Sequence, residues 1–256
     1  MSAKASLAGQ VALVTGAGGG IGRASALALA AQGAAIALVD LDQAGLQGTQ
    51  DAIIEAGAAA EPYLVDLAQA AAVAPLVETV LRRYGRIDIL VNCAGITGPR
   101  VTVLDADEAS WDKVMAINLK APFLLIRQIA PAMVAQGGGR IVSITSSSAH
   151  RPRNSLPAYG ASKSGLAQLT RSAAADLGPY NINVNAVAPG LTATRIVSDN
   201  FTPEALAGAV REGPLSNLLQ RVSQPEDIAA TVLFLCQAGS RQITGQTIHV
   251  SAGLIT

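Results

Sequence analysis

Short apolar runs recur along the chain and alternate with longer segments rich in helix-forming residues. Strands that alternate with helices are typical of a parallel sheet whose crossover helices cover both of its faces. The runs that we expect to form strands are Val11–Thr15, Ala34–Val39, Pro62–Val65, Ile87–Val91, Arg140–Thr145, Asn183–Ala188 and Gln246–Val250.

This alternation predicts an α/β Rossmann fold, with a doubly wound parallel sheet of about seven strands flanked by helices. The expected order places the first strand beside the fourth, so a cofactor would lie across the carboxyl ends of the strands. No internal repeat or low-complexity linker divides the chain, and Gly137-Gly138-Gly139 is interpreted as a turn before a strand. We expect a single domain over residues 1–256, with a substrate-binding loop at about 192–219.

Composition narrows the class of partner. Half of the residues are hydrophobic, and 18 basic residues balance 18 acidic ones. No strongly basic patch appears along the chain, so nucleic acid is not an expected partner. The longest uncharged stretch, Ala24 to Val39, is broken by Gln32-Gly33 and favours a helix joined to a strand over a membrane span; no secretory leader is apparent. Without a charged tail or patch, a small molecule is the expected partner. Cys93 and Cys236 lack CxxC spacing and are interpreted as buried, reduced thiols, which favours a cytoplasmic location.

A glycine-rich turn follows the first predicted strand. Gly16-Ala17-Gly18-Gly19-Gly20-Ile21-Gly22 leads into Arg23–Ala31, a run of helix formers. Glycine lets the backbone turn sharply and approach a ligand, and a helix amino terminus attracts a pyrophosphate. Asp40 ends the second predicted strand about 20 residues later, where a carboxylate suits the ribose hydroxyls of NAD and repels the 2′-phosphate of NADP. The segment predicts a dinucleotide site that prefers NAD.

Tyr159 and Lys163 stand four residues apart, and Ser146 lies upstream in a run of small polar residues. If Ala158 to Leu177 is helical, this spacing puts the phenol and the ammonium on one face. A free tyrosine has a pKa of about 10, so its use as a general base near pH 7 requires about 4 kcal/mol of phenolate stabilisation. One cation at about 4 Å contributes about that much. The alternative is an amphipathic helix with an incidental tyrosine and lysine.

Together these motifs resemble the short-chain dehydrogenase/reductase family, in the subfamily that carries TGxxxGxG and YxxxK. The resemblance covers essentially the whole chain. Thr15 to Gly22 matches the first motif, Asp66-Leu67 matches the dipeptide that contacts adenine, and Asn92-Cys93-Ala94-Gly95 resembles the NNAG turn after the fourth strand. Cys93 replaces the second asparagine, which puts one hydrogen bond of that turn in doubt.

The resemblance also implies the catalytic residues. Asn118, in Met115-Ala116-Ile117-Asn118-Leu119, falls where the family has its catalytic asparagine, and Ser146 precedes Tyr159 by the usual interval. Tyr159 would exchange the hydroxyl proton of a secondary alcohol while a hydride passes to or from NAD. Lys163 would lower the Tyr159 pKa and hold the nicotinamide ribose, Ser146 would position the substrate oxygen, and Asn118 would support a water chain.

Two further segments are compared with the family. Pro189-Gly190-Leu191-Thr192-Ala193-Thr194 matches PGxxxT, which holds the nicotinamide carboxamide, whereas Ser251-Ala252-Gly253 stands where Asp-Gly-Gly is usual. We expect the second departure to affect a turn and a subunit contact, not the chemistry. The expected cofactor contacts are Gly16, Gly20, Ile21, Gly22, Asp40, Leu41, Asp66, Leu67, Asn92, Ala94, Gly95, Tyr159, Lys163, Pro189, Gly190, Thr192 and Thr194.

The substrate itself is not encoded in a recognisable motif. His150 is a candidate pocket donor, although packing or surface polarity is the favoured interpretation of His150 and His249, and no metal site is expected near either. Trp111 is interpreted as a helix packing residue. Four arginines are candidates to surround the pocket mouth and meet an anionic substrate, although surface arginines are common: Arg100, Arg151, Arg153 and Arg195.

Three rival functions stay open. An NADPH-dependent 3-oxoacyl carrier-protein reductase shares the motifs, but Asp40 argues against it. A non-catalytic, cofactor-bound scaffold would be expected to lack one of the four catalytic residues. A dehydratase, epimerase or enoyl reductase usually has another glycine spacing or a longer interval than that between Tyr159 and Lys163.

Assembly is a further expectation from the resemblance. The helices around Asp107–Ala135 and Ala158–Leu177 resemble those of a four-helix interface, usually in a homotetramer, while a dimer remains open.

Overall fold

Seven parallel strands form one sheet in the order β3-β2-β1-β4-β5-β6-β7. The computed structural model describes residues 6–198 and 201–255. The strands are β1 (Val11–Thr15), β2 (Ala35–Asp40), β3 (Ala60–Leu64), β4 (Ile89–Asn92), β5 (Gly139–Ile144), β6 (Ile182–Pro189) and β7 (Thr247–Val250).

The predicted fold class is confirmed, because each strand lies within two residues of the run expected for it and β1 pairs with both β2 and β4. Burial of the strands explains why apolar runs in the sequence predicted them. Every residue of β1 and β6 is buried, as expected for strands covered on both faces. Pro62 lies in β3, an edge strand, where its missing N–H removes no hydrogen bond from the middle of the sheet.

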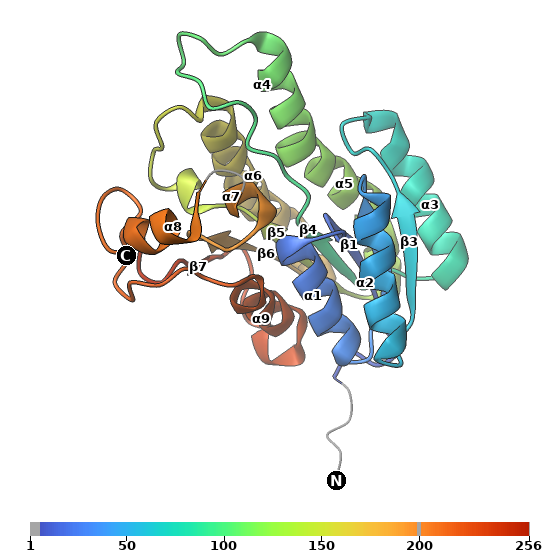
Figure 1. The fold of residues 1–256 in the computed structure, drawn as a ribbon. Helices are drawn as coiled ribbons and strands as arrows, with labels where there is room; N and C mark the ends of the chain where they lie inside the picture. The colour runs from blue at the N-terminus through green and yellow to red at the C-terminus, as the bar shows by residue number, and fades with distance from the viewer. Residues whose placement is uncertain (1–5, 199–200, 256) are drawn as a thin grey trace.

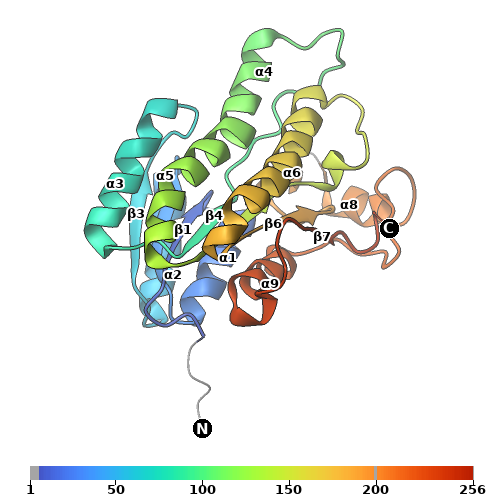
Figure 2. The same ribbon diagram turned by 180° about the vertical axis from the view of Figure 1, so that it is seen from behind.

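Helices cover both faces of the sheet (Figures 1 and 2). One layer contains α1 (Gly20–Ala31), α2 (Gln43–Glu55) and α9 (Pro225–Cys236). The other contains α3 (Val73–Tyr84), α5 (Ala121–Gln136) and α6 (Pro157–Leu177). The remaining helical segments are α4 (Glu108–Met115), α7 (Arg195–Ser198), α8 (Pro203–Ala209), a π-helical turn (Ala116–Lys120) and 3-10 turns at Ala70–Ala72, Ser147–Ala149, Gly178–Tyr180 and Ala238–Ser240.

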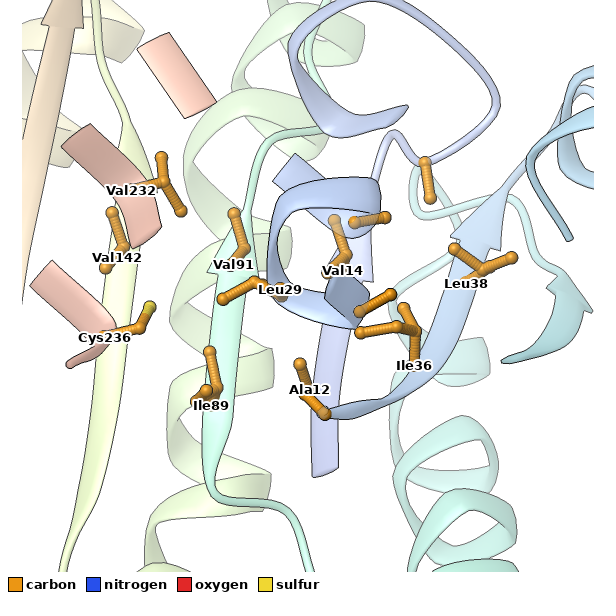
Figure 3. Close-up of a cluster of buried hydrophobic side chains, with 14 of the residues drawn as sticks. Ala12, Val14, Leu29, Ile36, Leu38, Ile89, Val91, Val142, Val232 and Cys236 are labelled. Atoms are coloured by element: carbon orange, nitrogen blue, oxygen red, sulfur yellow. The ribbon is translucent and has the colours of Figure 1, made fainter. Parts of the chain in front are cut away.

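The core has two layers because successive side chains of each strand point to opposite faces. Val14 packs in the layer beneath α1 and α9, with Leu29, Val91 and Val232, as Figure 3 shows. Leu13, the preceding residue of β1, packs in the opposite layer beneath α3 and α5. This burial fixes the strand register, because a slip by one residue would exchange the two layers.

The expected substrate-binding loop at about 192–219 contains α7 and α8, and its residues 199–200 lie outside the described part of the chain. The segment begins soon after β6. A parallel β-bridge pairs Thr192 with Ser223, which lies just before α9. Its position at the carboxyl end of the sheet makes it a neighbour of the glycine-rich turn, as the contacts below show.

Candidate active site

The predicted site residues gather at the carboxyl ends of the strands. The glycine-rich turn joins β1 to α1, Asp40 ends β2, Asn92 ends β4, and Ser146 follows β5. Because carboxyl ends of parallel strands share one edge of the sheet, residues far apart in sequence meet there.

The glycine-rich turn is pressed against the turn after β4. Gly16 has a φ of +68°, and a Cβ added to it would lie 2.9 Å from the Ala94 nitrogen. A Cβ at Gly22 would collide with the Gly16 carbonyl oxygen. Both positions therefore require glycine.

The amino terminus of α1 is open to a ligand. Gly19 is its N-cap residue; no side chain caps the helix, and no acidic residue lies in its first turn. By contrast, Asp42 caps α2 and Asp107 caps α4. A Cβ at Gly19 would meet no atom within 4 Å. The free N–H groups and the helix dipole of α1 suit a pyrophosphate in that space.

Asp40 borders the same turn. Its carboxylate accepts hydrogen bonds from the backbone N–H groups of Gly18 at 2.8 Å, Leu41 at 2.7 Å and Asp42 at 3.0 Å. These bonds fix a negative charge beside the glycines, where it can accept ribose hydroxyls and oppose a phosphate.

Asp66 and Leu67, which follow β3, differ in how far their side chains are exposed. Asp66 accepts a hydrogen bond from the Ala68 N–H at 2.9 Å and is partly exposed. The Leu67 side chain is buried in the core layer beneath α3. The predicted cofactor contact of Leu67 would therefore be made by its backbone. Leu41, by contrast, exposes its side chain beside Asp40.

Thr15 ties the turn after β4 to β1. Its hydroxyl accepts hydrogen bonds from the N–H groups of Cys93 at 3.0 Å and Ala94 at 3.1 Å, and donates to the Val91 carbonyl at 3.3 Å. The turn thus keeps its hydrogen bonds to β1 with cysteine in place of the second asparagine. Asn92 donates to Ser143 Oγ at 3.3 Å, while its Oδ1 is buried without a partner among the described residues. That oxygen is available to a ligand donor.

The prediction of two buried thiols is half right. Both cysteines are free, but only Cys236 is fully buried, whereas Cys93 is partly exposed. Burial raises the pKa of each thiol to about 12. Cys93 lies in the turn after β4, which borders the site. Its thiol and the Lys163 ammonium are close enough for each to affect the pKa of the other.

Asn118 is fully buried in the π-helical turn between α4 and α5. Its Oδ1 accepts from the Ile96 N–H at 2.9 Å, and its Nδ2 donates to the Ile96 carbonyl at 2.8 Å and to Ser162 Oγ at 3.0 Å. Ser162 in turn donates to the Tyr159 carbonyl at 2.8 Å, a link that the sequence interpretation did not include. A π-helical turn widens a helix locally and is often found at functional sites.

Gly95 shows how closely the groups converge. A Cβ at this position would lie 3.2 Å from Asn118 Oδ1 and 3.3 Å from Lys163 Nζ. The turn after β4, the π-helical turn and α6 therefore meet at one point.

Tyr159 and Lys163 share one face of α6, as predicted from their spacing. Lys163 Nζ lies 5.9 Å from the centre of the Tyr159 ring and donates to the Ile144 carbonyl at 2.7 Å. Burial lowers the pKa of Lys163 to about 8, so the ammonium remains charged at neutral pH.

The Tyr159 phenol has a pKa above its ordinary value because it is buried. A hydrogen bond with Ser146 and the charge of Arg153 act in the opposite direction. The sequence interpretation gave that part to Lys163, which here bonds a backbone carbonyl instead.

The segment after β6 closes over the glycine-rich turn. Thr194 lies against Gly20, because a Cβ added to Gly20 would be 3.3 Å from the Thr194 methyl carbon. The Thr192 hydroxyl is buried and donates to the Gly190 carbonyl at 3.3 Å. Pro189 ends β6, and the Gly190 N–H donates to the Val250 carbonyl at 3.0 Å.

Three other sequence candidates are His150, His249 and Trp111. His150 and His249 contact each other edge to face, with ring centres 4.6 Å apart, although they are 99 positions apart in the sequence. Trp111, interpreted as a helix packing residue, lies on α4 and is 38% exposed. Across residues 6–198 and 201–255, no group of three or more His, Cys, Asp or Glu side chains could hold a metal ion.

Together, the open helix terminus, the fixed Asp40 carboxylate and the unpartnered Asn92 oxygen fit a nicotinamide dinucleotide. Within the described part of the chain, no helix has the length and apolar character needed to cross a membrane.

Comparison with known proteins supports this interpretation. Residues 16–255 match a family model described as enoyl-(acyl carrier protein) reductase. The chain is 40% identical to the short-chain reductase protein NovJ of Streptomyces niveus, over 95% of this chain and 93% of that protein. It is 36% identical to the 3-oxoacyl-[acyl-carrier-protein] reductase FabG of Thermotoga maritima, over 97% and 99% of the two chains.

A solved structure has the same fold. The 7α-hydroxysteroid dehydrogenase complexed with NADH and 7-oxo glycochenodeoxycholic acid is 33% identical and superposes with a TM-score of 0.91, over 98% of this chain and 96% of that one.

Proposed function

The chain belongs to the short-chain dehydrogenase/reductase family, and from that premise we propose that it is an NAD-dependent oxidoreductase that interconverts a secondary alcohol and a ketone. The observation that carries this proposal is the partly buried Tyr159 beside Lys163, whose Nζ lies 5.9 Å from the ring centre and donates to the Ile144 carbonyl at the end of β5, two residues before Ser146. A phenol in this position can exchange a proton with an oxygen that the serine holds.

The four expected catalytic residues have distinct parts in this proposal. Tyr159 takes the alcohol proton in oxidation and returns it in reduction. Ser146 hydrogen-bonds the reacting oxygen, and Lys163 contributes a positive charge beside the phenol. Asn118 holds the backbone of Ile96 and, through Ser162, the first turns of α6, so it keeps Tyr159 in place.

A bound nicotinamide dinucleotide would accept or supply the hydride. Gly16, Gly20, Ile21 and Gly22 would hold its pyrophosphate at the amino terminus of α1, and the Asp40 carboxylate would bind the adenosine ribose. Asn92, Ala94 and Gly95 would line the middle of the site. The residues after β6 that would approach the carboxamide are Pro189, Gly190, Thr192 and Thr194.

Asp40 is the basis for proposing NAD rather than NADP. Its charge faces the glycine-rich turn, where the 2′-phosphate of NADP would bring a second negative charge close to it. The NADH complex of the 7α-hydroxysteroid dehydrogenase supports the same preference.

The principal alternative is an NADPH-dependent 3-oxoacyl carrier-protein reductase. The 36% identity to FabG favours it, whereas Asp40 argues against it. The interval of four residues between Tyr159 and Lys163 argues against enoyl reduction, although the family model carries that description. A non-catalytic scaffold is disfavoured because all four candidate catalytic residues are present.

A turnover screen tests the proposal. A varied panel of secondary alcohols and ketones is assayed with NAD(H) and NADP(H) in parallel, following the absorbance of the reduced nicotinamide. NAD-linked oxidation of an alcohol is the expected result. Preference for NADPH with 3-oxoacyl thioesters would instead establish the alternative, and silence of the whole panel would contradict both.

We further propose a homotetrameric enzyme in the cytoplasm. The exposed apolar side chains Trp111 on α4 and Phe123 and Val134 on α5 support the assembly, and two free cysteines are compatible with a reducing compartment.

A further inference from the structure

The two histidines of the chain meet beside the candidate active site. The ring centres of His150 and His249 lie 4.6 Å apart, and the ring planes are inclined by 73°. His150 directly follows the 3-10 turn after Ser146, whereas His249 lies on β7, at the edge of the sheet. Edge-to-face packing is an attractive arrangement of two aromatic rings. The contact therefore joins the last strand to the connection that carries Ser146.

His249 points to the face of the sheet that α6 covers. Ile248 and Val250, on either side of it, pack in the core layer beneath α1 and α9. Because successive residues of a strand point to opposite faces, the His249 side chain points to the other face. There the 3-10 turn packs against α6, and the Ser164 hydroxyl of α6 donates to the Ala149 carbonyl at 3.1 Å. The contact thus lies on the same side of the sheet as the helix that carries the candidate proton donor.

The short turn that ends at His150 is organised around Ser146. Ser146 Oγ accepts a hydrogen bond from the Ser148 N–H at 3.1 Å, and the Ser146 carbonyl accepts from the Ala149 N–H at 3.0 Å. The His150 N–H donates to the Ser147 carbonyl at 3.1 Å. A displacement of the His150 ring would therefore be transmitted through one turn to the serine that holds the reacting oxygen in the proposed function.

One nitrogen of His249 has no hydrogen-bond partner. Its Nδ1 is buried, and no group in the described part of the chain bonds to it. A neutral imidazole has one N–H donor, whereas an imidazolium has two, and each needs an acceptor. A proton on His249 would place a charged donor at a buried position without such an acceptor, which is unfavourable. The contact therefore suits a neutral His249 ring.

The surroundings of the pair do not compensate for such a proton. The 3-10 turn and β7 pack mainly against α6, β6 and α9, and β6 has no titratable side chain. The titratable side chains on the two helices are Tyr159, Lys163, Arg171 and Asp176 on α6, and Glu226, Asp227 and Cys236 on α9, while Arg151 follows His150 in sequence. Burial lowers the pKa of His249, and among the described residues only the charge of His150 acts on it as well, in the same direction.

We propose that His249 is a positioning residue of the active site, which holds His150 and the Ser146 turn while its ring is neutral and releases them when it gains a proton. This inference rests on the proposed oxidoreductase function and adds a control by pH. Because the folded-state pKa of His249 is lowered, the support is present above the ordinary histidine pKa and is lost as the pH falls through the lowered value.

Ketone reduction on the acid side of neutrality tests the inference. Tyr159 donates a proton in reduction, and its phenol stays protonated there because its pKa lies above the ordinary value. Reduction would therefore be level without the histidine pair. His249→Phe keeps a ring in the contact but cannot take up a proton, and His249→Ala removes the ring. Thr247→Val, on the same face of β7, removes a buried hydroxyl without a partner among the described residues and is the matched control.

We expect kcat/KM of the wild type and of Thr247→Val to fall about three- to tenfold between about pH 7.5 and pH 5. In His249→Phe the two values should agree within about twofold. His249→Ala should have a lower kcat/KM than His249→Phe at both pH values, again without the acid loss, and it keeps the test valid if the phenylalanine does not fit. A level wild-type profile, or an acid loss that both His249 variants retain, would overturn the inference.

Hydrogen exchange separates this inference from the proposed function, because it needs no turnover. After correction for the intrinsic exchange rates, the amides of Ser148 and Ala149, which bond to Ser146, should lose protection at the acid pH in the wild type but not in His249→Phe. Acid loosening of these amides without reduction of any ketone would contradict the oxidoreductase proposal alone. Ketone reduction with amides equally protected at both pH values would contradict the positioning role alone.

Discussion

Tyr159 lies among groups that act on its proton in opposite directions. Burial disfavours the phenolate, whereas the Ser146 hydrogen bond and the Arg153 charge favour it. Lys163 lies 5.9 Å from the ring centre and is held by the Ile144 carbonyl. The ionisation of the phenol therefore depends on an arginine outside the YxxxK pair.

Arg153→Gln should consequently move the pH dependence of the reaction. Removing a positive charge raises the Tyr159 pKa, so the rising limb of alcohol oxidation and the falling limb of ketone reduction should both move to higher pH. The profile of kcat/KM against pH measures this, with a neutral substrate so that anion binding plays no part. Arg82→Gln should leave the profile in place, and an unchanged or lowered limb in Arg153→Gln would contradict the account.

Asp40→Asn should weaken selection against NADP. The variant removes the charge but keeps an oxygen that can accept from the Gly18 N–H, so the turn is preserved. We expect the Kd for NADH to rise about tenfold, and the ratio of NADPH to NADH dissociation constants to fall at least as much. Fluorescence titration of the reduced cofactors measures both. Asp51→Asn on α2 is the control, and an unchanged ratio in Asp40→Asn would show that the charge does not select the cofactor.

Single residues also mark how far sequence reasoning reaches. Tyr159 and Lys163 were predictable, because their spacing is a property of one helix. The hydroxyl of Thr15 and the link through Ser162 were not, since each depends on which segments meet in three dimensions. The exposure of Cys93 has the same origin, because a residue's apolar neighbours in sequence do not determine what covers it.

At the scale of elements, the apolar runs predicted every strand, most clearly in the middle of the sheet, where strands such as β1 and β6 are buried throughout. The edge strands β3 and β7 are mostly only partly buried. The π-helical turn that carries Asn118 was not predictable. Its altered hydrogen bonding interrupts a continuous helical pattern, and the nearby Pro122 at the start of α5 does not by itself specify a π-helical turn. The contact between His150 and His249 likewise joins the start of one connection to the last strand.

The turn after β7 shows the effect of an unusual residue. Ala252 has a φ of +54°, in the left-handed region that favours glycine, at a position where the family usually has glycine. The turn is kept by hydrogen bonds from the Leu219 N–H to the Ala252 carbonyl at 3.1 Å and from the Leu254 N–H to the Ser251 carbonyl at 3.0 Å. The departure from Asp-Gly-Gly therefore places backbone strain at Ala252 in this turn.

Ala252→Gly should stabilise the protein. Relief of the left-handed strain outweighs the added flexibility of glycine in the unfolded chain, for a net gain of about 0.5–1 kcal/mol. Chemical denaturation measures the free energy of unfolding. Ala175→Gly, at an exposed position within α6, should instead destabilise by about 1 kcal/mol. Destabilisation by Ala252→Gly would contradict the assignment of strain to this turn.

At the scale of the molecule, an apolar surface that includes the exposed side chains of Trp111 on α4 and Phe123 on α5 lies over α4, α5 and α6. Figure 2 shows these three helices together. A hollow on it is lined by Asp112, Met115, Ala116, Leu119, Lys120, Phe123 and Leu169. Phe123 is 45% exposed, and so is Phe234 on α9. Helical surfaces of this kind suit the predicted interface between subunits.

Phe123→Asp should therefore dissociate the proposed tetramer, because it places a charge within a buried apolar contact. Light scattering coupled to size-exclusion chromatography measures the mass. Phe234→Asp changes an equally exposed phenylalanine on another face and should leave the assembly intact. If Phe123→Asp keeps the mass of the wild type, the interface lies elsewhere, and a monomeric wild type would refute the assembly.

The most direct test of the central claim is turnover by Tyr159→Phe. This variant removes only the phenolic hydroxyl, so NADH binding should stay within about twofold while kcat/KM falls about 100- to 10,000-fold. Tyr180→Phe, at a tyrosine that is 50% exposed, is the matched control and should keep full activity. Loss of turnover with intact NADH binding is the result that the account predicts. Turnover by Tyr159→Phe at the wild-type rate would contradict the role of Tyr159 in proton transfer.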